Sequence, residues 1–250
     1  MKLKILSYNI HKGYDWRKKN YFLKEIKAFI DGSGADLVFL QEVTGQNIKY
    51  QKKGLVDAQF EFLADSLWKH FAYAKNAIYD FGHHGNLILS KYPIAKWENI
   101  NLSTNLFEKR GLLFCKLHIV PLNIYLNAGC VHLNLLHRGR QVQYQIIKKY
   151  LVSLNLDPST PLIIGGDFND WNKRSADVFE KILGMKDAYK QSHGQYARTF
   201  PAASPFMCVD RIYTKNLKIL NSQVLQPISK THLSDHLPLL CEVEVQSIIQ

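Results

Sequence analysis

Polar residues able to bind a metal ion or a phosphate recur where apolar, strand-like runs of this sequence end. Asn9, Glu42 and His132 each follow such a run, and Asp167 and Asn169 follow a fourth. Hydrolysis of a phosphoester needs oxygen ligands for a hard cation, a base that orients water, and donors for charged oxygens. Side chains at strand ends are held by a rigid scaffold. These residue types therefore favour metal-assisted phosphoester chemistry.

The second half of the chain repeats the pattern. Asp210 directly follows the apolar pair 208–209, and the triplet 234–236 (Ser-Asp-His) precedes the apolar run 237–240. In extended chain, side chains two residues apart share a face. Asp167 and Asn169 are therefore expected to point into one site, with Phe168 turned to the core. The glycines at 165 and 166 are expected to leave the backbone open to a ligand.

Each of these residues also has a plainer interpretation when taken alone. Asn9 and the 165–170 segment could be turns, Glu42 a solvated strand end, Ser234 a helix N-cap, and His132 a satisfied core histidine. The combination in this order is much less common by chance than any single piece. It favours a catalytic site.

Short strands must position these residues. Nine strand-like runs are predicted, at 2–9, 36–42, 86–90, 112–120, 122–133, 161–166, 207–213, 217–225 and 237–245. Helical periodicity is present at 22–30 and 147–154, and a helix is plausible over 59–69. Strict alternation of strand and helix fails between 86 and 133. An α/β (α+β) fold follows, a four-layer α-β-β-α sandwich of two packed mixed sheets flanked by helices.

Composition narrows the class of protein. The 250 residues contain no repeat and no long linker, which predicts one domain over 1–250. A net charge of +11 and a pI near 9.4 favour polyanionic partners such as nucleic acid, anionic membranes or phosphorylated substrates. Cys115, Cys130 and Cys241 lie in apolar runs, which argues against disulfides and thiolate zinc sites. No signal peptide or membrane span is evident, so a cytoplasmic location is expected.

Seven motifs in order resemble the endonuclease/exonuclease/phosphatase superfamily, which includes DNase I-like nucleases, AP endonucleases, sphingomyelinases, inositol polyphosphate phosphatases and deadenylases. They are SYN (7–9), LQE (40–42), GNLILS (85–90), VHL (131–133), GGDFN (165–169), VDRIY (209–213) and SDH (234–236). The resemblance runs from residue 3 to residue 245. It is closest to small bacterial members whose substrates are uncertain. It implies a DNase I-like fold and a Mg²⁺-dependent phosphoester hydrolase.

The resemblance also implies a metal site. Glu42 would be the main Mg²⁺ ligand, with Asn9 beside it and Asp235 contributing directly or through water. Related AP endonucleases carry an aspartate two residues after the first-motif asparagine, where this chain has His11. A neutral imidazole is a poor Mg²⁺ ligand, which weakens the AP-endonuclease interpretation and leaves Mn²⁺ open as the working metal.

The remaining roles concern water and phosphate. Asp167 would position or deprotonate the attacking water, and Asn169 would steady it. His236 would interact with the phosphate, and Asp210 would fix the tautomer and charge of the His236 ring. His132 and Arg110 would contact phosphate oxygens, and Asn86 would organise hydrogen bonds beside the metal. Arg110 and Asn86 are assigned to substrate binding. Trp171 replaces an arginine usual in inositol phosphatases, which weakens that interpretation.

Several functions stay open at this point. The first hypothesis is a phosphodiesterase or nuclease that cleaves a P–O bond by in-line attack of an activated water. A phospholipid head-group phosphodiesterase or a phosphatase is the alternative, although no apolar insertion loop is evident. A catalytically silent phosphate-binding module is the alternative of another class, and a structural domain without metal is a third. No obligate protein partner is indicated.

Overall fold

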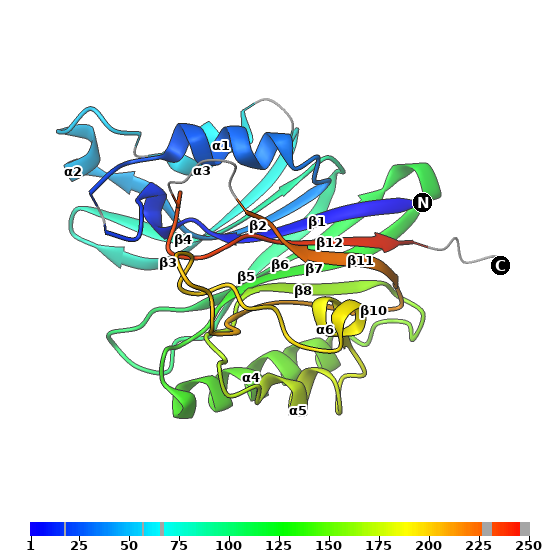
Figure 1. Cartoon of the computed structure of the whole chain (residues 1–250). Helices are drawn as coiled ribbons and strands as arrows, with labels where there is room; N and C mark the ends of the chain where they lie inside the picture. The colour runs from blue at the N-terminus through cyan, green and yellow to red at the C-terminus, as the bar shows by residue number, and fades with distance from the viewer. Residues whose placement is uncertain (18, 57, 66–67, 227–231, 246–250) are drawn as a thin grey trace.

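Two six-stranded mixed sheets form the centre of the computed structural model, which describes residues 1–17, 19–56, 58–65, 68–226 and 232–245 (Figure 1). The first sheet has the order β11-β12-β1-β2-β4-β3. Its strands are β1 (Lys2–Asn9), β2 (Leu37–Asn47), β3 (His70–Tyr79), β4 (Gly82–Ser90), β11 (Lys218–Val224) and β12 (Leu239–Glu244). The second has the order β5-β6-β7-β8-β10-β9. Its strands are β5 (Ile94–Asn101), β6 (Gly111–Ile119), β7 (Ile124–His132), β8 (Leu162–Asp167), β9 (Lys186–Asp187) and β10 (Asp210–Lys215).

Each sheet has one parallel pair at its centre. β1 pairs with β2 and β7 pairs with β8 in parallel, and the other pairs are antiparallel. Parallel neighbours require a crossover connection. The helices α1 (Leu23–Gly32) and α4 (His137–Ser153) provide it. The carboxyl ends of the four parallel strands therefore lie at one edge, the usual place for a site in such sheets.

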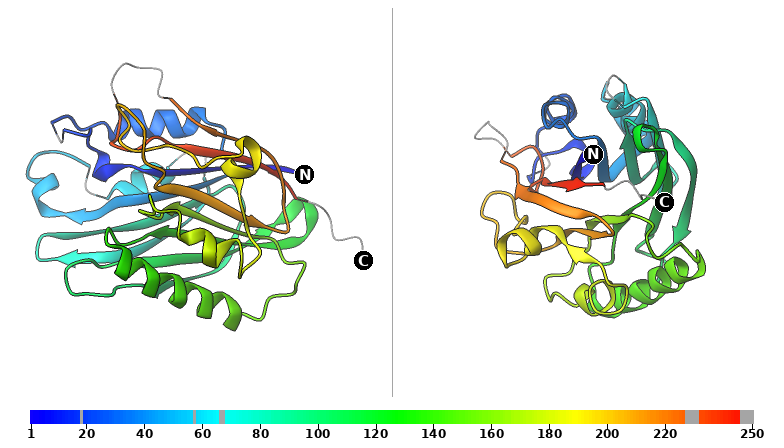
Figure 2. Two further views of the ribbon diagram at one scale, coloured as in Figure 1. Left: turned by 60° about the horizontal axis from the view of Figure 1, so that its bottom comes forward. Right: turned by 90° about the vertical axis from the view of Figure 1, so that its right-hand side faces the viewer.

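The shorter helices lie in the connections. They are η1 (His11–Gly13), α2 (Ile48–Gln51), α3 (Gln59–Ala64), η2 (Val120–Leu122), α5 (Ser175–Phe179) and α6 (Ala188–His193). Figure 2 shows α1 outside one sheet and α4 outside the other. Within the described residues, no helix is long and apolar enough to cross a membrane.

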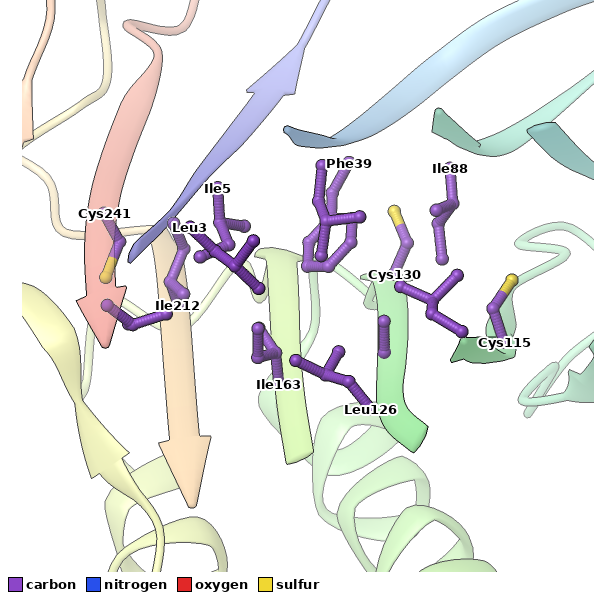
Figure 3. Close-up of a cluster of buried hydrophobic side chains, with 14 of the residues drawn as sticks. Leu3, Ile5, Phe39, Ile88, Cys115, Leu126, Cys130, Ile163, Ile212 and Cys241 are labelled. Atoms are coloured by element: carbon purple, nitrogen blue, oxygen red, sulfur yellow. The ribbon is translucent and has the colours of Figure 1, made fainter. Parts of the chain in front are cut away.

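The main core lies between the sheets. Ile5 and Phe39 of the first sheet face Leu126, Cys130 and Ile163 of the second (Figure 3). Buried side chains of α1 cover the outer face of the first sheet, and those of α4 cover the second. The predicted four-layer sandwich is confirmed. That the chain is a single domain stays a prediction.

Several predicted helices and strands need correction. Strands β3, β5 and β9 were not predicted: the first two are edge strands with many exposed residues, and β9 has only two residues. The helix expected over 59–69 ends at Ala64, where Asp65 adopts an extended backbone, and residues 66–67 lie outside the described part. Strand β2 does not stop at Glu42 but bulges there and continues to Asn47.

Two expectations about side chains are also corrected. A Cβ on Gly165 would lie 2.7 Å from the Phe39 ring, and one on Gly166, at φ +138°, would lie 2.0 Å from the Val131 carbonyl. These glycines therefore admit neighbouring protein groups rather than a ligand. The basic residues of the segment 138–149 predict a solvated helix face, but Arg140 in this segment is fully buried. Cys115, Cys130 and Cys241 are buried and free, as predicted.

Candidate active site

A cavity of about 340 Å³ opens where the parallel strands end. Eight of the ten predicted site residues line it: Asn9, Glu42, Arg110, His132, Asp167, Asn169, Asp235 and His236. Leu135, Trp171, Phe200, Met207 and Val209 supply its apolar wall. Residues up to 227 positions apart in the sequence, Asn9 and His236, thus meet in one space.

The sheets place these residues directly. Asn9, His132 and Asp167 are the last residues of β1, β7 and β8. Asp210 begins β10, which runs antiparallel to β8, and it pairs with Asp167 in register. An antiparallel neighbour starts where the parallel strand ends, so both kinds of strand deliver side chains to the same edge.

Glu42 reaches the cavity through a β-bulge. The pairing of β2 with β4 shifts between Leu40 and Val43, and Glu42 has a left-handed backbone, φ +57°. A bulge inserts an extra residue and redirects its side chain. A non-glycine residue at positive φ is disfavoured and is retained where the surrounding structure enforces it. Asn169, which lines the same cavity, shares this conformation, and so do His11 and Lys12 after β1.

Asp167 lies at the centre of the hydrogen-bond network. Its Oδ2 accepts a hydrogen bond from Asn9 Nδ2 at 3.1 Å, and its Oδ1 accepts one from the Asn169 backbone N–H at 2.9 Å. His132 Nε2 and His236 Nε2 lie 3.5 and 3.7 Å from the same Oδ2. Two imidazoles and one amide thus surround a single carboxylate oxygen.

His236 and Asp210 form a buried couple. His236 Nδ1 donates to Asp210 Oδ2 at 2.9 Å, and Thr199 Oγ1 donates to the same oxygen at 2.5 Å. Burial lowers the pKa of His236, but Asp210 and Asp167 together outweigh it and raise that pKa to about 10. His236 is therefore an imidazolium at neutral pH, with Nε2 turned towards Asp167.

The other two titrating groups shift in opposite senses. Burial, reinforced by Asp210, raises the pKa of Asp167 to about 6 against the opposing charge of His236. Burial, reinforced by Arg110, holds the pKa of His132 well below its usual value. Near pH 7 the site therefore combines an ionised but basic Asp167, a neutral His132 and a charged His236. Separated pKa values of this kind are typical of acid–base sites.

Three oxygen-bearing side chains fit a hard cation. Glu42, Asp235 and Asn9 all line the cavity. Burial opposes ionisation of Glu42, but the charge of Lys12, with Nζ 3.3 Å from Oε2, holds its pKa far below the usual range. Asn9 Oδ1 accepts one hydrogen bond from the His11 N–H at 3.1 Å and keeps a second lone pair. A permanently ionised carboxylate with neighbouring oxygens is the donor set that Mg²⁺ or Mn²⁺ prefers.

A second group of potential ligands is already engaged in hydrogen bonds. Asp167, Asp210 and His236 offer ligand atoms that all lie within 4.8 Å of one another. Asp210 Oδ2 accepts bonds from both His236 and Thr199. We therefore interpret these three residues as a proton-handling group and the Glu42 side of the cavity as the metal side.

The two residues assigned to substrate differ in position. Arg110 lines the cavity and donates weakly to Glu108 Oε1 at 3.4 Å, and its Nε is buried without a hydrogen-bond partner among the described residues. The positive charge of a guanidinium at the cavity wall suits an anionic oxygen. Asn86 does not line the cavity. Its Nδ2 donates to the carbonyls of Gly111 and Cys130, at 3.0 and 3.1 Å, and so joins the two sheets.

Sequence reasoning missed several groups that the structure brings to the site. Lys12 pairs with Glu42, Thr199 supports Asp210, and Ser234 Oγ donates to the Asn9 carbonyl at 2.7 Å. Ser234 was visible inside the SDH motif. The signal for Lys12 was its place three residues after Asn9. Thr199 lies in a long connection with no local pattern to reveal it.

A larger cavity of about 490 Å³ adjoins the metal side. It is lined by His11, Lys12, Tyr14, Lys19, Tyr21, Tyr50, Lys53 and Leu55. The rings of Tyr14, Tyr21 and Tyr50 pack edge to face, with centroids 5.2 to 6.0 Å apart. Lys12, which pairs with Glu42, and Lys19 and Lys53 bring positive charge to this larger cavity, which suits anions.

Comparison with known proteins identifies the family of this chain. A model of the endonuclease/exonuclease/phosphatase family matches residues 6–236. The chain belongs to this family. The protein YbhP of Escherichia coli strain K12 is 36% identical over 245 residues, which is 97% of this chain and 96% of YbhP.

Solved structures of the endonuclease/exonuclease/phosphatase family share the fold. One from Beutenbergia cavernae superposes with a TM-score of 0.78 at 17% identity, over 98% of this chain and 72% of that one. One from Bacteroides vulgatus gives 0.78 at 19% identity, over 98% and 100%. Members of this family are metal-dependent phosphoesterases, among them nucleases and phosphatases.

Proposed function

We propose that this chain is a metal-dependent phosphodiesterase that hydrolyses a P–O bond by in-line attack of water. The observation that carries the proposal is the convergence of Glu42, Asp167 and His236 on one cavity. Their charge states suit the three tasks of cation binding, water activation and phosphate stabilisation. Nucleic acid and phospholipid head groups are the substrate classes that the basic charge favours.

The protein's own residues support each task. Asp167 orients the attacking water and accepts its proton, since its pKa lies close to neutrality. Asn9 and the Asn169 backbone fix the carboxylate through both of its oxygens. The His236 imidazolium and the neutral His132 donate to phosphoryl oxygens, and Arg110 adds a positive charge at the cavity wall.

Glu42, Asn9 and Asp235 would hold the cation, Mg²⁺ or Mn²⁺. When bound, this cation neutralises charge on the phosphoryl group and polarises the P–O bond. Lys12 keeps Glu42 ionised and lies where a bound cation would replace it. The leaving oxygen takes its proton from solvent or from His236, and no covalent enzyme intermediate is involved.

A soluble diester tests the proposal. Bis(p-nitrophenyl) phosphate should be hydrolysed in the presence of Mg²⁺ or Mn²⁺, and EDTA should reduce turnover to background, with recovery on addition of excess metal. Glu42→Gln should raise the metal concentration needed for half-maximal activity by about tenfold or more, because one full charge is lost. The control Glu98→Gln alters a carboxylate remote from the cavity. Full turnover in EDTA would contradict the metal role.

A further inference from the structure

The mouth of the catalytic cavity carries an unusual number of exposed apolar side chains. Leu106 and Phe107 in the β5–β6 connection are 82% and 96% exposed, Leu136 before α4 is 71% exposed, and Phe206 is 66% exposed. Leu135 and Trp171, which line the cavity itself, are also exposed. We call these six residues the apolar rim. The sequence suggested no apolar insertion loop, because only two large apolar residues occur together in the segment 103–110.

Two segments of the apolar rim, the β5–β6 connection and the segment before α4, are held together by polar contacts. The Leu135 N–H donates to Glu108 Oε1 at 3.3 Å, and Asn134 Nδ2 donates to Thr104 Oγ1 at 2.7 Å. These bonds fix the β5–β6 connection against the segment before α4, and both lie at one end of the molecule in Figure 1.

The buried Arg140 completes this framework. Its Nη1 donates to the carbonyls of Asn134 and Leu135, at 3.1 and 2.5 Å, and its guanidinium lies 4.6 Å from the centre of the Trp171 ring. Burying an arginine costs free energy, and here only Nη1 has hydrogen-bond partners among the described residues, since Nε and Nη2 have none. Here a fully buried guanidinium holds two rim residues in place, so the exposure of Leu135 and Trp171 is built into the fold rather than incidental.

Cationic groups lie beside the apolar rim. A second hollow of about 380 Å³ shares Trp171 and Met207 with the catalytic cavity, and Phe206, Lys173 and Arg198 also line it. Lys109 lies two residues after Phe107 in the sequence, and Arg138 lies two residues after Leu136. The acid within the rim, Glu108, is engaged by Arg110 and the Leu135 N–H. The net charge of the chain, +11, has the same sign.

Aliphatic side chains with basic neighbours suit a lipid surface. Large apolar patches next to a site mark an interaction surface, and peripheral proteins combine buried apolar area with attraction to anionic lipids. Single-stranded nucleic acid is held instead by aromatic platforms along a basic groove. Leu106, Leu135 and Leu136 offer no such platform, although Phe107, Trp171 and Phe206 do. Binding of nucleic acid would therefore leave the exposure of the three leucines of the apolar rim unexplained.

We propose that the apolar rim docks on an anionic lipid surface, so that a phospholipid head group enters the catalytic cavity and its phosphodiester is the substrate. This inference rests on the proposed function for the hydrolysis step. Water adds to phosphorus, one P–O ester bond breaks, and the departing oxygen is protonated. The rim would lie in the interfacial region of the lipid while the cavity opens towards the head groups.

Vesicle flotation tests the docking separately from the chemistry. The wild-type protein should float with vesicles of phosphatidylglycerol and phosphatidylcholine, and less with pure phosphatidylcholine. The double variant Leu106→Ser, Phe107→Ser should lose about tenfold or more of its vesicle affinity, because both side chains stand in solvent and leave water on docking. The control double variant Val152→Ser, Ile182→Ser removes exposed apolar groups remote from the cavity and should float like the wild type.

Two activity assays accompany flotation. Release of water-soluble phosphate products from the same vesicles should fall about tenfold or more in Leu106→Ser, Phe107→Ser, whereas hydrolysis of bis(p-nitrophenyl) phosphate should stay within about twofold of the wild type. Hydrolysis of the soluble diester without vesicle binding overturns the lipid inference and leaves the proposed function standing. Vesicle binding without hydrolysis of either substrate overturns the proposed function, and with it the phospholipid as substrate, but leaves the docking of the apolar rim standing.

Other occupants of the apolar rim give different results. A rim that serves nucleic acid would lose affinity for a single-stranded oligonucleotide in Leu106→Ser, Phe107→Ser while vesicle binding stays unchanged. A rim that pairs two copies of the chain would give a dimer by light scattering that this variant dissociates. Either result, or equal loss of vesicle binding in the control variant, overturns the proposal.

Discussion

Asp210 controls the charge of the site through His236. Its carboxylate accepts a hydrogen bond from His236 Nδ1 at 2.9 Å and lies opposite Asp167 in the strand register. It therefore raises both pKa values, that of His236 to about 10 and that of Asp167 to about 6, although burial opposes the first shift and dominates the second. The free enzyme needs Asp167 ionised and His236 protonated. A bell-shaped dependence of kcat/KM on pH follows, with limbs set by these two groups.

Asp210→Asn should move both limbs to lower pH. Loss of the negative charge lowers the pKa of His236, so activity is lost at a lower pH on the alkaline side. It also lowers the pKa of Asp167, so activity appears at a lower pH on the acid side. The pH profile of kcat/KM for bis(p-nitrophenyl) phosphate measures both shifts. Asp36→Asn, at an ion pair with Lys91, should leave the profile unchanged. An unaltered alkaline limb in Asp210→Asn would contradict the assignment.

Single residues with a motif were predictable, and residues without one were not. Asp167, Asp235 and His236 stand in recognisable triplets, and the structure places them in one cavity. Thr199 has no local signal, since its contact with Asp210 depends on how a connection of more than ten residues packs. The role of Lys12 depends on a left-handed backbone at φ +58° that the sequence does not specify.

At the scale of elements, Asn86 forms hydrogen bonds that connect the two sheets. Its side chain on β4 donates to the carbonyls of Gly111 in β6 and Cys130 in β7. Buried carbonyls that lose their donor cost free energy. The residue therefore holds the edge of the sandwich from which His132 and Arg110 project.

Asn86→Ala should lower the free energy of unfolding by about 1–3 kcal/mol, because two buried carbonyls lose a hydrogen bond. The KM for bis(p-nitrophenyl) phosphate should stay within about twofold of the wild type. Urea unfolding and steady-state kinetics measure the two effects. Asn99→Ala, at an exposed contact with Asn76, should cost less than about 0.5 kcal/mol. A large rise in KM with unchanged stability would instead make Asn86 a substrate ligand.

The central strands were predictable from their apolar runs. Of the edge strands, β11 was predicted, whereas β3, β5 and β9 were not. β1, β7 and β8 are buried on both faces, so hydrophobic runs mark them clearly. β3 and β5 lie at sheet edges and expose many side chains, which removes the alternation on which the prediction depends. The bulge at Glu42 was equally hidden, because it arises from pairing with β4 rather than from local sequence.

At the scale of the whole molecule, two similar halves meet at one edge. Each contributes a parallel pair and a crossover helix, α1 or α4. The first sheet supplies Asn9 and Glu42, the proposed cation ligands, and the second supplies His132 and Asp167. The sandwich was predictable from the order of the elements. How closely the halves approach depends on the packing of Phe39 against Gly165, which no sequence pattern indicated.

The central claim is that Asp167 and His236 act as one catalytic unit. A double-mutant cycle in kcat for bis(p-nitrophenyl) phosphate, with Mg²⁺ present, tests it most directly. Asp167→Asn and His236→Gln should each reduce kcat by about 10³-fold or more, and the double variant should be little slower than either, as expected for residues that work together. Folding of each variant is checked by circular dichroism. Either single variant retaining near wild-type kcat, or fully additive losses in the double variant, would contradict the account.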